Sequence, residues 1–176
     1  IQILDLPGLI KGASEGKGRG KEILGVVRNS DMVLFIVDPF QHAHFHVLHR
    51  ELEIAALRLN QTKPPVFITR TERGGIDVRS TVEQTHLSDA EIADIIRSFG
   101  IVSAIVTMRV DVTADMIVDT LAENRIYNQA VIAINKIDLA TEEELVSAEK
   151  ALPKDWPVMR ISAVKGDGIE EMKDFI

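Results

Sequence analysis

The sequence contains no cysteine, few aromatic residues and no long hydrophobic run. Without cysteine, the chain can form neither a disulfide framework nor a thiolate metal site, and it is compatible with a reducing compartment. Its apolar runs, such as 33–37, are far too short to span a bilayer, and no charged segment followed by an apolar one opens the chain. We therefore expect no membrane partner and take the cytoplasm as the default compartment.

Positive charge is also in short supply. The sequence has 20 lysine and arginine residues against 27 aspartate and glutamate residues, a formal net charge of -7. Such a chain has no general attraction for nucleic acid or an anionic membrane, so contact with RNA would need a local basic patch. With 45% hydrophobic and 27% charged residues over 176 positions, the composition is that of a globular protein able to bury one good core or two small ones.

Both ends of the sequence fall inside expected secondary structure. The first residue is Ile1 and not methionine, and it lies in an apolar stretch typical of the middle of a strand. Residues 169–176 keep the three-to-four spacing of a helix with no stop signal after them. These patterns predict a fragment of a longer protein, with residues missing at both ends.

Strand and helix patterns alternate along most of the chain. Nearly continuous apolar runs at 1–4, 32–37 and 130–134 suit strands that are buried on both faces of a parallel sheet. Helical patterns follow at 21–28, 43–59 and 142–152. This alternation predicts a three-layer α/β domain.

The segment from about Gln61 to Asn128 departs from that alternation. Its patterns predict a compact ββαβα unit: strands at 66–69 and 76–82 separated by a Gly74-Gly75 turn, a helix from Ser88 to Gly100, a strand at 101–110 and a helix capped by Thr113. These elements could belong to one continuous sheet or form an inserted domain. The spacing of the motifs described below favours the insertion.

Asp5-Leu6-Pro7-Gly8 follows the first expected strand. In a D-x-x-G motif the carboxylate can hold a water on Mg²⁺, and the glycine amide can meet a terminal phosphate without obstruction by a side chain. Alone, the pattern is weak evidence, because it arises by chance in about half or more of chains of this length. A simple turn after a strand is the alternative interpretation.

Asn135-Lys136-Ile137-Asp138 is a sharper motif, since it comes directly after the apolar run 130–134. Open α/β sheets bind ligands at this end of their strands. The Asp138 carboxylate can accept from N1–H and the exocyclic amine of guanine, a donor pair that adenine does not present. Asn135 can tie the base to neighbouring loops and bond its N7 or O6 side, and the Lys136 stem can lie along a ring face. A polar turn between strand and helix is the alternative interpretation.

Ser162-Ala163-Val164 follows a strand expected at 157–161. The Ala163 amide could donate to guanine O6, provided that no bulky side chain intervenes. A Ser-Ala pair is uninformative by itself. As the third motif in order, each at the end of its strand, it strengthens the prediction of a guanine site.

The stretch Asp5 to Ala13, followed by Gly16-Lys17-Gly18-Arg19-Gly20-Lys21-Glu22, resembles the second switch region of the Obg-like GTPases. More narrowly it resembles the developmentally regulated GTP-binding (DRG) proteins. The Gly74-Gly75-Ile76 turn leading to Ser80-Thr81 also looks like the segment that DRG proteins carry within the G domain. The resemblance covers essentially the whole chain and implies an α/β Ras-like P-loop NTPase G domain, three-layered and mostly parallel, with an inserted small α+β domain.

The distance between motifs supports the insertion. Gly8 and Asn135 lie 127 positions apart, whereas two helices, two strands and their loops need only about 50 to 60. We therefore assign 1–60 and 129–176 to the G domain and 61–128 to the inserted domain.

The resemblance also implies a role for particular residues. Asp5 would hold the Mg²⁺ of bound GTP through a water, and Gly8 would contact the γ-phosphate at the catalytic position. The base site would comprise Asn135, Lys136, Asp138, Ser162, Ala163 and Val164. Leu9 stands where Ras-like proteins have a water-orienting glutamine, and because an apolar side chain cannot hydrogen-bond the attacking water, slow hydrolysis is implied. Whether a monovalent cation assists is left open.

A phosphate-binding G-x-x-x-x-G-K motif followed by Ser or Thr is missing, as is the first switch threonine that the family places before Asp5. We interpret Gly12–Gly20 as a mobile switch and not as a substitute phosphate cradle. The resemblance implies a slow GTP/GDP switch that works with the ribosome or a translation factor and with a dedicated partner protein.

A non-catalytic protein- or RNA-binding module that keeps only the base-recognition loops is the alternative. Without the phosphate loop, this chain alone would be inactive. It could also self-associate through the gap left by the strand that should feed that loop.

Four polar side chains form a separate stripe on the helix expected at 43–59: His42, His46, His49 and Glu53. Their spacing places them on one side of the helix beside its apolar face. A divalent metal could bind there. We favour a polar helix flank, because no group that would orient the histidines is visible.

Overall fold

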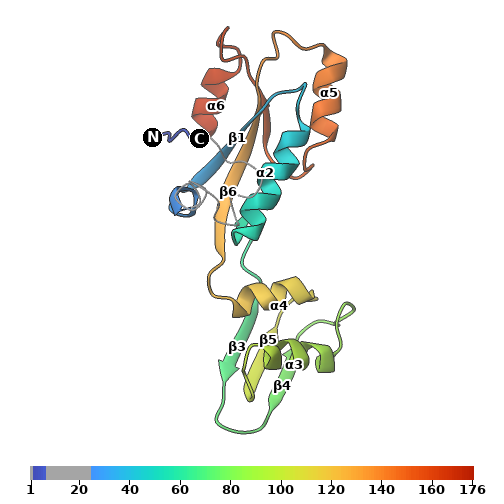
Figure 1. Ribbon diagram of the computed structural model, residues 1–176. Coiled ribbons are helices and arrows are strands. Elements are labelled where there is room, and N and C mark those ends of the chain that lie inside the picture. The colour runs from blue at the N-terminus through green and yellow to red at the C-terminus, as the bar shows by residue number, and fades with distance from the viewer. Residues whose placement is uncertain (1, 7–24) are drawn as a thin grey trace. The chain divides into compact units, whose positions relative to one another are not determined.

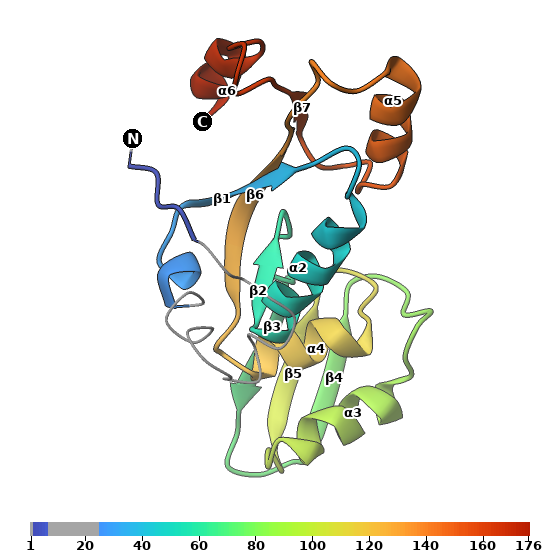
Figure 2. The ribbon, with the colours of Figure 1, turned by 45° about the horizontal axis from the view of Figure 1, so that its top comes forward.

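The computed structural model describes residues 2–6 and 25–176 of the chain. These residues divide into two compact units, Ile1–Gln61 with Ile126–Ile176 and Thr62–Arg125 (Figures 1 and 2). The sequence interpretation ended the second segment at Asn128. Residues 126–128 instead pair with Leu57–Leu59 in the first unit, so the division falls three residues earlier. No helix within the described residues is both long enough and apolar enough to cross a membrane.

The first unit is built on a parallel sheet whose central strand is β6 (Ile126–Ile134). This strand pairs with β1 (Met32–Val37), β2 (Leu57–Leu59) and β7 (Val158–Arg160), in each case in parallel. The run 130–134 is buried at every position, which is why it is apolar throughout. The predicted parallel α/β architecture is therefore confirmed, and its central strand begins four residues earlier than expected.

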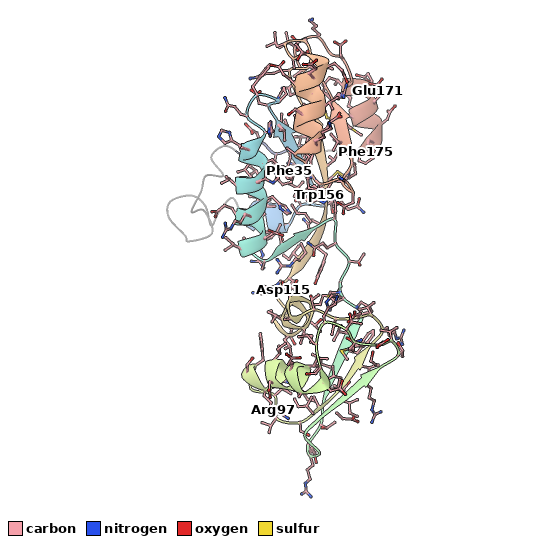
Figure 3. The ribbon with its side chains drawn as sticks, turned by 90° about the vertical axis from the view of Figure 1, so that its right-hand side faces the viewer. Phe35, Arg97, Asp115, Trp156, Glu171 and Phe175 are labelled. Carbon is pink, nitrogen blue, oxygen red and sulfur yellow. The ribbon has the colours of Figure 1, made fainter. Side chains whose placement is uncertain are left out.

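Helices α2 (Ala43–Ile54), α5 (Glu142–Lys150) and α6 (Ile169–Phe175) belong to this unit, as does the helical stretch 25–28. Its core contains an aromatic cluster in which Phe45 contacts Phe35 and Trp156, with ring centroids 5.0 and 5.7 Å apart. Figure 3 shows Phe35 and Trp156 side by side. The cluster joins β1 and α2 to the segment that leads into β7. Strand β7 ends two residues before the predicted base-site residue Ser162.

Two expectations for this unit were wrong. The helix predicted over 43–59 ends at Ile54, because Ala56 takes a left-handed φ of 69° and the next three residues form β2. Leu57 and Leu59 are 0% and 1% exposed, so burial beside β6 outweighs the helical spacing of the leucines.

The strand predicted at 1–4 is not formed over its described residues, 2–4. Ile3 and Leu4 are 74% and 56% exposed. Among the described strands, β1 pairs only with β6, and residues 2–4 pair with none of them. An apolar run needs such a partner before it can form a buried strand.

The second unit is a three-stranded sheet covered by two helices. Its order is β3 (Val66–Arg70), β5 (Ala104–Met108), β4 (Ile76–Ser80), with β5 antiparallel to β3 and parallel to β4. Helices α3 (Asp89–Ser98) and α4 (Ala114–Leu121) share one core with the strands. The Gly74-Gly75 turn therefore joins two strands that do not pair with each other. The helix predicted to begin at Ser88 is present as α3, and Ser88 and Glu91 form a capping box at its start.

Candidate guanine-base site

Two loops of the candidate site meet at the carboxyl end of the parallel sheet. Asn135 follows β6 directly, and Ser162 comes two residues after β7. The strands are in register up to Ile134 and Arg160, and the Ile161 amide donates to the Ile134 carbonyl at 2.8 Å. Parallel pairing therefore places both sequence motifs at one edge, where open α/β sheets bind ligands.

Asn135 ties three segments of this edge together. Its amide donates to the carbonyl of Val37 at the end of β1, over 2.9 Å. Its side-chain Oδ1 accepts from the amides of Lys136 at 2.8 Å and Ala163 at 3.0 Å. The asparagine side chain thus joins its own loop to the loop after β7. Its contact with the base stays a prediction.

The sequence interpretation predicts that the Ala163 amide donates to guanine O6, but in the structure this amide already has an acceptor. It donates to Asn135 Oδ1 at 3.0 Å. Sequence alone could not reveal this, because the bond joins residues 28 positions apart. Contact with a base oxygen would require a shared, three-centre hydrogen bond or a small displacement of the Asn135 amide.

Ser162 holds the Asp138 carboxylate in place. The serine hydroxyl donates to Asp138 Oδ1 at 2.7 Å, and the Lys165 amide donates to the same hydroxyl at 3.1 Å. Ser162 is fully buried, and its hydrogen bond lowers the pKa of Asp138. The half-buried carboxylate is thus ionised at neutral pH and keeps acceptor capacity for two donors on one edge of a base.

Lys136 turns its side chain toward β1. Its backbone has a left-handed φ of 65°, and its Nζ donates to Asp38 Oδ2 at 2.7 Å. Asp38 Oδ1 accepts from the Phe40 amide at 2.9 Å. The hydrogen bond from Lys136 lowers the pKa of Asp38. The sequence analysis missed Asp38, although its place after a strand beside β6 was a usable signal.

Val164 and Leu139 present apolar side chains next to these polar groups. They are 91% and 69% exposed, and they directly follow Ala163 and Asp138 in the chain. An aromatic ring placed against Asp138 would cover apolar surface of this kind.

Two family descriptions cover almost the whole chain. The one described as "50S ribosome-binding GTPase" matches residues 1–71, and the one described as "C-terminal region of MMR_HSR1 domain" matches residues 73–176. An uncharacterized GTP-binding protein of Methanocaldococcus jannaschii is 42% identical over 179 residues, covering 100% of this chain and 45% of the relative.

Two eukaryotic relatives carry more specific names. Developmentally-regulated G-protein 3 of Arabidopsis thaliana is 38% identical over 159 residues, which is 90% of this chain and 43% of the relative. Ribosome-interacting GTPase 1 of Saccharomyces cerevisiae is 41% identical over 147 residues, which is 82% of this chain and 40% of the relative. The chain belongs to the developmentally regulated GTP-binding (DRG) family. It spans less than half the length of these three relatives.

The phosphate-side residues expected for a DRG protein are only partly described. Asp5 is exposed at one end of the short segment 2–6, while Gly8, Leu9 and the glycine-rich stretch 12–20 lie outside the described residues. Within the described chain, no three or more acidic or histidine side chains gather into a metal-binding cluster.

The histidine stripe of α2 lies partly against the core. The His49 ring stacks on Phe45 at 5.7 Å and meets Trp156 edge-on at 5.1 Å, so its first role is packing. His49 Nδ1 lies 3.9 Å from a Glu53 carboxylate oxygen, and His42 Nδ1 lies 3.1 Å from the Pro39 carbonyl. The histidines thus face different neighbours and do not converge on one point.

Proposed function

We propose that this chain carries the base-recognition half of a GTP-binding switch, in which Asp138 reads guanine and Asn135 and Ser162 hold the reading edge in place. The 2.7 Å bond between Ser162 and Asp138 is the observation that carries this proposal, because it presents a fixed, ionised acceptor at the carboxyl end of β6. Membership of the DRG family supports it. Lys136, Ala163 and Val164 complete the surroundings of the base.

The decisive experiment changes the base preference. In the full-length protein, Asp138→Asn should shift preference from GTP to XTP by about a hundredfold or more, since xanthine carries an acceptor where guanine has its exocyclic amine and an amide can donate to it. Asp155→Asn, at an exposed aspartate of the same unit, is the matched control and should leave the preference unchanged. A variant at position 138 that keeps its full preference for GTP contradicts the assignment of the base site.

We further propose slow hydrolysis with Mg²⁺ as the cofactor. The apolar Leu9 at the water-orienting position supports slow turnover, because such a side chain gives the attacking water no hydrogen bond. Asp5 would hold Mg²⁺ through a water, and Gly8 would meet the γ-phosphate. Single-turnover assays of the full-length protein would measure the rate of hydrolysis. In the same assay, Asp5→Ala should raise the Mg²⁺ concentration needed for half-maximal rate.

The names of the relatives and of the matching family support a role at the ribosome. We propose that the full-length protein works there, in the cytoplasm and with a dedicated partner, and that the second unit is an inserted domain that contributes a binding surface. Co-sedimentation with ribosomes in the presence of GDP and of a non-hydrolysable GTP analogue would test this. A full-length protein that sediments with ribosomes but binds no nucleotide would instead favour the alternative, a protein- or RNA-binding module.

Self-association through the outer edge of β1 stays a prediction. Among the described strands, β1 pairs only with β6, and Ile36 on β1 is 64% exposed. Exposed strand edges readily pair with another chain. Light scattering of the 176-residue chain over a range of concentrations would detect it.

A further inference from the structure

Asp38 occupies a place at the sheet edge that is equivalent to that of Asn135. Strands β1 and β6 are parallel and in register from Met32 opposite Gln129 to Val37 opposite Ile134. The next residues along are Asp38 and Asn135, and the Asn135 amide still donates to the Val37 carbonyl at 2.9 Å. Asp38 therefore lies beside the base motif, although about 100 positions separate the two in sequence.

The carboxylate of Asp38 is oriented from both sides. Its Oδ1 accepts the Phe40 amide at 2.9 Å, and its Oδ2 accepts Lys136 Nζ at 2.7 Å. The backbone amide comes from the turn after β1, so the carboxylate has one orienting contact that does not depend on the lysine. Its side chain is 25% exposed, against 51% for Lys136, and the more buried partner thus holds the freer one.

A free lysine side chain samples many rotamers, and ordering it costs conformational entropy. With its ammonium bound to Asp38, the Lys136 stem is held between a fixed Cα and a fixed Nζ. Its methylenes then offer a ready apolar surface to a flat ring. The same contact occupies the ammonium, which would otherwise be free to pair with the Asp138 carboxylate two residues further on and compete with the guanine donors.

We propose that Asp38 is a positioning residue of the guanine site: it anchors the Lys136 ammonium so that the lysine stem forms one wall of the base pocket and leaves Asp138 free for the base. This inference rests on the proposed function. It assigns a task to a residue outside the three sequence motifs. It also predicts that Asp38 acts only through Lys136.

The test measures GDP affinity of the full-length protein by titration of a fluorescent GDP analogue. Asp38→Asn keeps the shape of the side chain but loses its charge, and we expect the affinity to fall about three- to tenfold. Lys136→Ala should weaken binding at least as much. The double variant should bind no more weakly than Lys136→Ala alone, because the aspartate has nothing left to hold.

Two controls separate positioning from folding. Glu170→Gln breaks another ion pair of the same unit, Glu170 with Lys173 at 2.6 Å, and should leave the affinity unchanged. Asp38→Glu keeps the charge and should recover part of the loss. Thermal unfolding of each variant should differ from wild type by no more than a few degrees, since a partly exposed ion pair adds little to stability.

Either of two results would overturn the proposal: Asp38→Asn binding GDP as tightly as wild type, or losses from Asp38→Asn and Lys136→Ala that add in full. Additive losses together with a lowered unfolding temperature would mean a purely structural role. If the wild-type protein binds no guanine nucleotide, the proposed function itself fails, which the wild-type titration reveals before any variant is made.

Discussion

Ser162 and Asp138, 24 positions apart in sequence, are joined by a hydrogen bond of 2.7 Å between Oγ and Oδ1. The serine is buried completely, and its own amide donates to the Asp167 carbonyl at 2.9 Å. The loop after β7 therefore helps to orient the Asp138 carboxylate, together with the backbone of Asp138 itself. The hydroxyl at position 162 thus supplies the hydrogen bond that holds this carboxylate oxygen.

Replacing Ser162 by alanine should raise the pKa of Asp138 toward its ordinary value, because the bond that favours the ionised form is gone. A group with a lowered folded-state pKa contributes stability above its unfolded-state pKa of about 3.9, and that contribution disappears as the pH falls through the folded-state value. The loss of stability on acidification below about pH 4 should therefore be shallower in Ser162→Ala.

Carboxyl-carbon NMR titration of Asp138 measures this pKa directly. Ser147→Ala, at an exposed serine of α5, is the matched control and should leave the titration of Asp138 as it is in wild type. An Asp138 pKa that is the same in Ser162→Ala and wild type would show that the serine does not stabilise the carboxylate.

Asn135→Ala should destabilise the protein by about 1–2 kcal/mol, because the amides of Lys136 and Ala163 both lose their acceptor. Asn135→Asp keeps an acceptor oxygen in the same place and should cost clearly less. Urea unfolding of both variants gives the comparison. Equal losses would mean that the acceptor oxygen is not what holds the two loops together.

The sequence predicted the central strands and the site edge because both rest on local signals. The run 130–134 is apolar without interruption since it is buried on both faces. The motifs at Asn135 and Ser162 follow two strands of the same parallel sheet. In a parallel sheet, residues that follow their strands lie at one edge, and Asn135 and Ser162 both do so.

The features that sequence did not predict depend on distant partners. Leu57 and Leu59 continue a helical spacing, yet they form a strand because β6 supplies both a hydrogen-bonding edge and a buried place. Ile3 and Leu4 carry a strand pattern but have no neighbouring strand in the described chain. Asp38 has no motif of its own, and only the register of β1 on β6 reveals that it meets Lys136.

Gly166 and Gly168 provide a paired test of the loop that supports Ser162. Both have left-handed backbones, with φ of 85° and 71°. A side chain at Gly166 would enter open space, whereas a Cβ at Gly168 would overlap the carbonyl oxygen of Arg160. Gly166→Ala should therefore cost only the conformational penalty of about 1–2 kcal/mol, and Gly168→Ala should cost more, about 3 kcal/mol or above.

The Gly168→Ala substitution should also disturb the proposed base site. Arg160 is the last residue of β7, two positions before Ser162, so backbone displaced by a Cβ at position 168 would pull the serine away from Asp138. Urea unfolding and GDP titration of the two alanine variants of the full-length protein measure both effects. Gly168→Ala should lose stability and GDP affinity together, while Gly166→Ala keeps its affinity close to wild type. Two variants with equal stability would show that the loop yields to the extra methyl group, and that contact with Arg160 does not hold Ser162 in position.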